Sequence, residues 1–203
     1  MGYGHSTGGT ILLSYLMEHG DADFSGFCFN SPFLDWGWVG GSLIKFAITT
    51  LPALLTRLRL WSADSELLAG GGSNAWALQL QSQYYFDPRS RPLYNVPVTV
   101  GFCCGINDVH AKLRKLGRAG VAITRKPFVV FTSKGDDILD GDATAEQAHA
   151  IGPSRTLVQL SYARHDVFTS ADASVVQGAL AYLDTWLKSI VSADEKDGAA
   201  CVR

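Results

Sequence analysis

The stretch Gly4-His5-Ser6-Thr7-Gly8-Gly9 lies near the start of the chain, and it decides how the rest of the sequence is interpreted. Glycines two residues before and two residues after a serine relieve the crowding of a sharp strand-to-helix turn, and Gly9 permits close packing. Apolar side chains at helical spacing follow at once, and Gly20 stands where a helix commonly ends. We therefore predict a tight turn at Ser6 and a helix that runs from there to His19, although a serine at a helix start is also a common N-cap.

Continuous apolar runs further along the chain predict strands that are buried on both faces. Residues 127–133 and 156–161 form two such runs, and residues 24–30 form an earlier strand. Residues 172–190 carry apolar side chains three or four positions apart, which predicts an amphipathic helix. Residues 105–117 are expected to form a further helix that returns to the sheet. Because strands alternate with helices, the sequence predicts an α/β fold: a mostly parallel sheet with crossover helices on both faces.

A serine hydroxyl is a poor nucleophile unless a base takes its proton, and the base needs an acid to hold its tautomer. The sequence places an aspartate pair, Asp136-Asp137, directly after the run 127–133, and places His165 directly after the run 156–161. Both positions follow the carboxyl ends of predicted strands, where open parallel sheets carry their sites. The pattern favours nucleophilic catalysis, although His165 could also be an ordinary loop histidine.

Five motifs together resemble one branch of the α/β-hydrolase superfamily. In chain order they are Gly4-His5-Ser6-Thr7-Gly8-Gly9, Asn30-Ser31-Pro32-Phe33-Leu34-Asp35, Phe86-Asp87-Pro88-Arg89, Thr132-Ser133 before Asp136-Asp137-Ile138-Leu139-Asp140, and His165-Asp166. The resemblance is to the serine aminopeptidase-like branch, whose better-known members are monoacylglycerol lipases and lysophospholipases, and it covers the chain from Met1 to about Leu187. It implies the α/β-hydrolase fold with an inserted helical cap.

The resemblance also implies the roles of individual residues. Ser6 would be the nucleophile, His165 the general base and Asp136 the acid, while the N–H of Thr7 would supply half of the oxyanion hole. The order Ser, Asp, His along the chain is that of α/β-hydrolases. These four residues are our predicted catalytic site.

Two other aspartates compete with Asp136 for the role of the acid. Asp136 is preferred over Asp137 because the family places one variable residue and then two aliphatic residues after the acid. Asp35 is the runner-up, since some members carry the acid after the preceding strand. The four histidines other than His165 are expected to be structural or solvent-facing.

The family normally has four or five strands before the nucleophile turn, whereas only residues 1–3 precede it here. The missing portion would carry the second oxyanion donor, and its absence would expose an apolar sheet edge that favours aggregation. We therefore expect the carboxyl-terminal part of a hydrolase sheet: residues 1–191 form an incomplete hydrolase domain, with a cap at about 36–104 and a flexible tail at 192–203. An ordinary helical layer without a binding role is the alternative for the cap.

The composition fits a soluble globular protein: the 203 residues are 47% hydrophobic and 18% charged. The balance of 17 basic and 19 acidic residues shows no electrostatic footprint for nucleic acid. No apolar stretch supplies the roughly 20 residues of a spanning helix, so no integral membrane segment is expected. The four cysteines lack metal-ligand spacing, which predicts free thiols in a reducing, cytoplasmic setting without a metal.

The function that these observations favour is hydrolysis of carboxylic esters through an acyl-enzyme, without a cofactor. The apolar, Trp-rich cap indicates a small hydrophobic ester as the substrate. One alternative is a serine aminopeptidase, which would need an acidic pair for the substrate's ammonium group, and no such pair is evident in the cap. Another is a truncated chain that is weak or inactive and that binds a hydrophobic ligand without turnover. The sequence gives no indication of the oligomeric state.

Overall fold

The computed structural model describes residues 1–36, 42–68, 98–136 and 138–200. Much of the predicted cap, the motif Phe86-Asp87-Pro88-Arg89 and the competing acid Asp137 lie outside these ranges. Among the described residues, no helix is both long enough and apolar enough to cross a membrane.

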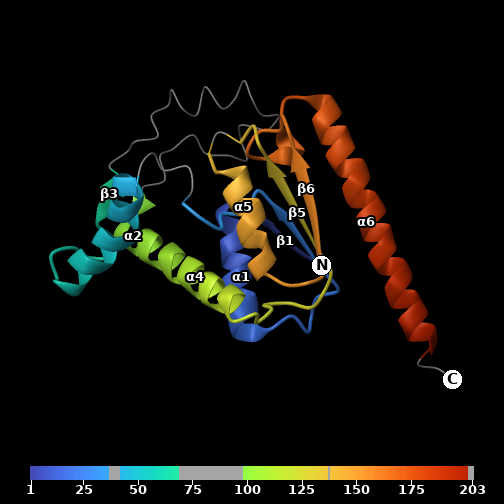
Figure 1. Ribbon diagram of the computed structural model, residues 1–203, viewed down its shortest axis with the longest axis horizontal. Coiled ribbons are helices and arrows are strands. Elements are labelled where there is room, and N and C mark those ends of the chain that lie inside the picture. Colours follow the sequence, from blue (N-terminus) through green and yellow to red (C-terminus); the bar gives the residue numbers. More distant parts are fainter. Residues whose placement is uncertain (37–41, 69–97, 137, 201–203) are drawn as a thin grey trace.

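Four parallel strands form the central sheet, in the order β1-β2-β5-β6 (Figure 1). They are β1 (Gly2–His5), β2 (Phe27–Asn30), β5 (Phe128–Ser133) and β6 (Arg155–Leu160). The register aligns His5 with Asn30, Asn30 with Phe131 and Phe131 with Val158. All carboxyl ends therefore meet at one edge of the sheet, which confirms the predicted parallel α/β architecture.

The sheet is covered on both faces because the side chains of its strands alternate. On one face, Phe128 and Val130 of β5 pack in a cluster with α1 (Thr7–His19). On the other face, Val129 and Phe131 pack against α6 (Ala173–Ala200). Figure 1 shows α6 on one side of the strands and α1, α4 and α5 on the other. All six residues of β5 are buried, as expected for a strand with helices on both sides.

The first strand lies at one edge of the described sheet, since β1 pairs with β2. Tyr3 on this strand is 57% exposed, and Ile11 of α1 is 64% exposed. One of these exposed side chains lies on the edge strand and the other on the helix that follows it. The effect of this edge on self-association stays a prediction.

The remaining elements lie around this core. They are α2 (Ser42–Arg57), the antiparallel pair β3 (Glu66–Leu68) and β4 (Val98–Thr99), α4 (Val100–Arg118), α5 (Gly141–Gln147) and the 3-10 turns η1 (Ala148–Ala150) and η2 (Val167–Thr169). Asn107 of α4 joins α2 to the loop after β2: its Oδ1 accepts from Trp36 Nε1 at 2.8 Å, and its Nδ2 donates to the Ile48 carbonyl at 3.1 Å.

Two helix boundaries differ from the sequence predictions. Helix α4 begins at Val100, earlier than the predicted Gly105, because Thr99 caps it by accepting from Phe102 N at 3.1 Å. Helix α6 continues to Ala200 and includes most of the residues assigned to the tail at 192–203. Apolar spacing marks only the part of a helix that packs on the sheet, and the segment beyond Ile190 is rich in residues that favour a helix without such packing.

Candidate active site

Ser6 occupies the junction between β1 and α1 in a conformation that few serines adopt. Its φ of 53° and ψ of −125° lie far from the extended values typical of an N-cap residue, and its side chain makes no capping hydrogen bond. A non-glycine residue at such a φ carries strain on the order of 1–3 kcal/mol, and that strain concentrates at functional sites. The hydroxyl of Ser6 is therefore not used as a helix cap.

Backbone hydrogen bonds from three segments hold this junction in place. Ser6 N donates to the carbonyl of Asn30 at 3.1 Å, which continues the β1–β2 ladder by one residue. The Ser6 carbonyl accepts from Gly9 N and from Phe33 N, each at 3.0 Å. The strained backbone of Ser6 is therefore held by hydrogen bonds to other residues.

Two of the three glycines around Ser6 are required by close backbone approach. A Cβ on Gly4 would lie 2.7 Å from Gly9 Cα, and a Cβ on Gly9 would lie 2.6 Å from Pro32 Cβ. By contrast, a Cβ on Gly8 would meet no atom within 4 Å. The expectation that Gly8 relieves crowding was wrong, because Gly8 lies on the exposed side of α1, where a side chain would meet no neighbouring segment. Gly9, which the sequence also predicts as a packing residue, performs that function.

Asp136 and His165 form a buried pair at the carboxyl ends of β5 and β6. His165 Nδ1 lies 2.9 Å from Asp136 Oδ2, and the two side chains are 5% and 2% exposed. The other carboxylate oxygen, Oδ1, accepts from the backbone N–H groups of Ile138 and Leu139, both at 2.8 Å. With Nδ1–H donating to the carboxylate, Nε2 is the basic nitrogen of the imidazole ring.

His165 reaches the end of the sheet that carries Ser6. Its ring centroid lies 5.0 Å from that of His5, the residue that precedes Ser6. Since β6 is three strand spacings from β1, or about 14 Å, the loop after β6 folds back across the sheet edge. The structure thus brings the predicted base, with its acid, to the predicted nucleophile turn.

No protein-family model and no curated protein matches the sequence. Solved structures do match, each over 93% of this chain. A monoacylglycerol lipase of Paleococcus ferrophilus is 18% identical with a TM-score of 0.63, and a soluble variant of the monoglyceride lipase of Saccharomyces cerevisiae, in complex with a substrate analogue, is 21% identical with a TM-score of 0.62. A thermostable carboxyl esterase of Bacillus coagulans, in complex with glycerol, is 13% identical with a TM-score of 0.59.

The chain has the α/β-hydrolase fold. It spans 67%, 61% and 64% of the lengths of those three proteins. The likeness concerns the fold, and the chemistry has to be argued from the site itself.

Within this α/β-hydrolase fold, Thr7 and Asp35 take different positions around Ser6. Thr7 begins helix α1, where the first N–H groups have no acceptor within the helix and the helix dipole favours negative charge. Asp35, the runner-up acid, follows β2 and forms an ion pair with Arg114 of α4, with 3.5 Å between Oδ2 and Nη1. The competing residue Asp137 lies outside the described residues.

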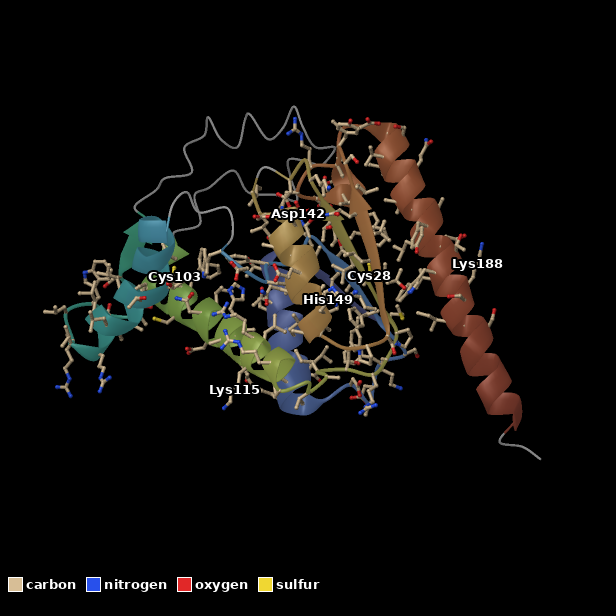
Figure 2. All side chains as sticks on the ribbon, viewed as in Figure 1. Cys28, Cys103, Lys115, Asp142, His149 and Lys188 are labelled. Carbon is tan, nitrogen blue, oxygen red and sulfur yellow. The ribbon has the colours of Figure 1, made fainter. Side chains whose placement is uncertain are left out.

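The three described cysteines are free thiols, and Cys201 lies outside the described ranges. Cys28 lies on the sheet face covered by α6, as Figure 2 shows, and burial raises the pKa of its thiol to about 12. A thiol with such a pKa is not a nucleophile near neutral pH. In the part of the chain that the structure describes, no group of three His, Cys, Asp or Glu side chains is arranged to hold a metal ion.

Sequence reasoning missed one polar residue beside the site. Asn30 ends β2, is fully buried, and its side chain bonds to the two residues that follow His165. The signal was present in the sequence, because an asparagine closes an otherwise apolar strand, Phe27–Asn30. A buried amide needs hydrogen-bond partners, so its position predicts a polar contact at the sheet edge.

Proposed function

We propose that this protein is a serine hydrolase that cleaves carboxylic esters, with Ser6 as nucleophile, His165 as general base and Asp136 as the acid. The observation that carries the proposal is the conformation of Ser6. Its backbone is strained, its hydroxyl makes no capping hydrogen bond, and it lies at the same sheet edge as the buried His165–Asp136 pair. Helix capping does not account for Ser6, and nucleophilic catalysis accounts for both features together.

The chemistry follows from these groups. Ser6 Oγ attacks the carbonyl carbon of the ester while His165 Nε2 takes its proton, and Asp136 stabilises the resulting imidazolium. The N–H of Thr7, at the positive end of α1, donates to the oxyanion of the tetrahedral intermediate. Collapse of the intermediate releases the alcohol, which takes the proton from His165 and leaves an acyl group on Ser6. Water, activated by the same histidine, then hydrolyses the acyl-enzyme.

Apolar residues next to these groups support a hydrophobic substrate. Phe33, whose N–H bonds to the Ser6 carbonyl, and Leu139, whose N–H bonds to Asp136, belong to one apolar cluster with Trp36. Binding pockets are lined mainly by such side chains. The lipases and the esterase named above favour the same class of substrate.

A fluorophosphonate probe tests the proposal because it reacts with activated serines. We expect labelling of Ser6, identified by peptide mapping, and loss of labelling in Ser6→Ala. The matched control is Ser25→Ala, which changes an exposed serine on the same chain and should label like the parent. Labelling that persists in Ser6→Ala would contradict the assignment of the nucleophile.

Substrate class is tested with two chromogenic compounds that release the same kind of reporter. A short-chain aryl ester should turn over with a burst of the phenol, which reports the acyl-enzyme. An aminoacyl anilide should turn over more slowly, and the reverse preference would favour the aminopeptidase alternative. Turnover of neither compound by a folded chain would favour the inactive alternative.

A further inference from the structure

We propose that Asn30 is a positioning residue of this site, which clamps the loop carrying His165 to the strand end that carries Ser6. This inference rests on the proposed hydrolase function and deepens it. Asn30 belongs to neither the nucleophile turn nor the Asp136–His165 pair, so its role is separate from the catalytic groups.

The geometry of the sheet creates the need for such a clamp. Ser6 and His165 follow β1 and β6, the two edge strands of the described sheet, which lie about 14 Å apart. The hydrogen bond that His165 Nδ1 donates to Asp136, which follows the neighbouring strand β5, orients the imidazole ring. It does not hold the loop over β2 and β1, where the ring has to meet the serine.

The Asn30 side chain makes this longer connection. Nδ2 donates to Asp166 Oδ1 at 2.8 Å, and Oδ1 accepts from Val167 N at 3.2 Å. Nδ2 also donates to the hydroxyl of Tyr3 on β1 at 3.1 Å. The amide thus holds both residues that follow His165 and ties them to the strand that leads to Ser6.

The backbone of the same residue holds the nucleophile. The carbonyl of Asn30 accepts from Ser6 N at 3.1 Å. One fully buried residue therefore contacts the serine through its main chain and the histidine loop through its side chain. A shift of Asn30 changes the distance between the two reacting groups, and a misplacement of about 1 Å can cost about a hundredfold in rate.

The chemistry of the amide explains why asparagine suits this position. It offers a donor to the carboxylate of Asp166 and an acceptor to the N–H of Val167 in one planar group. Asp166 Oδ1 also accepts from Phe168 N at 3.2 Å, so this one carboxylate oxygen accepts two hydrogen bonds. An aspartate at position 30 would retain the acceptor for Val167 but would set two carboxylates against each other.

The test compares Asn30→Asp with the exchanged pair Asn30→Asp/Asp166→Asn in the full 203-residue chain. The exchange restores a donor opposite an acceptor. Tyr3→Phe removes only the contact to β1. Thr124→Val is the control for stability, because it removes the hydrogen bond that the buried Thr124 donates to Asp21 at 2.6 Å, away from the sheet edge that carries Ser6.

Two readouts separate positioning from mere destabilisation. We expect kcat for an aryl ester to fall by about ten- to a hundredfold in Asn30→Asp, with KM changed less than about threefold. The low-field proton resonance of His165 Nδ1–H, assigned by its loss in His165→Gln, should broaden or disappear in Asn30→Asp. Both signals should return in the exchanged pair and should stay close to the parent in Thr124→Val. Tyr3→Phe, which removes one of the contacts of the clamp, should lower both signals less than Asn30→Asp does.

An unchanged resonance and an unchanged kcat in Asn30→Asp would overturn the proposal. The proposal would also be overturned if kcat and the resonance fell only in proportion to the melting temperature, and fell by the same amounts in Thr124→Val. If the parent is not labelled at Ser6, the hydrolase function fails, but the resonance still decides the clamp: its loss in Asn30→Asp and its return in the exchanged pair support it, and its persistence overturns it.

Discussion

Ser6 and Thr99 both stand between a strand and a helix, yet they use their hydroxyl groups differently. Thr99 adopts an extended conformation, with φ of −88° and ψ of 161°, and its side chain accepts from Phe102 N. Ser6 has a positive φ and makes no such bond. One hydroxyl stabilises its helix, and the other is withheld from it.

The difference lies in what supports each backbone. Thr99 has the extended conformation that is usual at a helix start, so the contacts of its backbone with the segment 63–66 hold no strained residue. The conformation of Ser6 is imposed by tertiary contacts with Asn30 and Phe33. Strain that is held by surrounding structure, at a residue that does not stabilise its own helix, indicates a functional position.

The largest effect that we expect comes from Ser6→Ala. Removal of the hydroxyl should lower esterase turnover by at least about 10⁴-fold, because the residual rate depends on the oxyanion donors alone. The free energy of unfolding should stay within about 0.5 kcal/mol of the parent, because no capping bond is lost. Turnover is measured with an aryl ester and stability by urea denaturation. A large loss of stability would mean that Ser6 caps α1 after all, as Thr99 caps α4.

Asp136→Asn should be the next most damaging change. The amide would favour the wrong tautomer of His165. In a Ser-His-Asp triad, the same aspartate-to-asparagine change lowers kcat by about 10⁴-fold, and we expect a loss of up to that size here. Asp35→Asn is the matched control, since it alters a carboxylate paired with Arg114 rather than with the imidazole of His165. Steady-state kinetics on both variants decide between the two acids, and a crippled Asp35→Asn would identify the runner-up as the acid.

Glycine substitutions test how the strained turn is supported. Gly4→Ala and Gly9→Ala should each lower the free energy of unfolding by about 1–3 kcal/mol, because each new methyl group overlaps neighbouring atoms. Gly8→Ala should be neutral or stabilising by about 0.5 kcal/mol, since alanine favours the helix and meets open space. Chemical denaturation gives all three values. Equal losses at the three positions would show that the turn is not packed as described.

The smallest effect should come from the conventional helix start. Thr99→Ala should cost about 1 kcal/mol of stability through loss of the cap, and Thr99→Ser should cost much less. Neither change should alter kcat for the aryl ester. A fall in kcat for both variants would link this end of α4 to the site and remove the contrast with Ser6.

Much of this arrangement could be predicted from sequence because the decisive signals are local. The strand around Phe128 is a continuous apolar run and is fully buried, as predicted. The prediction that the strand around Thr156 is buried on both faces was wrong, because β6 is an edge strand of the described sheet and its residues are half-buried or exposed. Asp136 and His165 follow β5 and β6, and Ser6 follows the short strand β1, so their convergence at one sheet edge follows from the parallel topology. The prediction of the parallel sheet, which the structure confirms, was based on these local patterns.

The features that sequence could not supply depend on contacts between distant segments. Nothing local distinguishes Gly8 from Gly9, because the difference lies in the approach of Pro32. The clamp by Asn30 joins residues 137 positions apart, beyond any periodicity or motif. The start of α4 was missed for a different reason: Gly105 resembles a helix entrance, while the true signal was the cap at Thr99.

The separation between Asn30 and the histidine loop has a consequence for biosynthesis. A ribosome adds about 5–20 residues each second, so the 137 residues between Asn30 and Val167 take about 7 to 27 s to appear. Throughout that interval the nascent chain carries its serine without the imidazole beside it. In the proposed mechanism, Ser6 gains its base only when the loop that follows β6 docks on Asn30, so an unfinished polypeptide has no general base with which to attack esters.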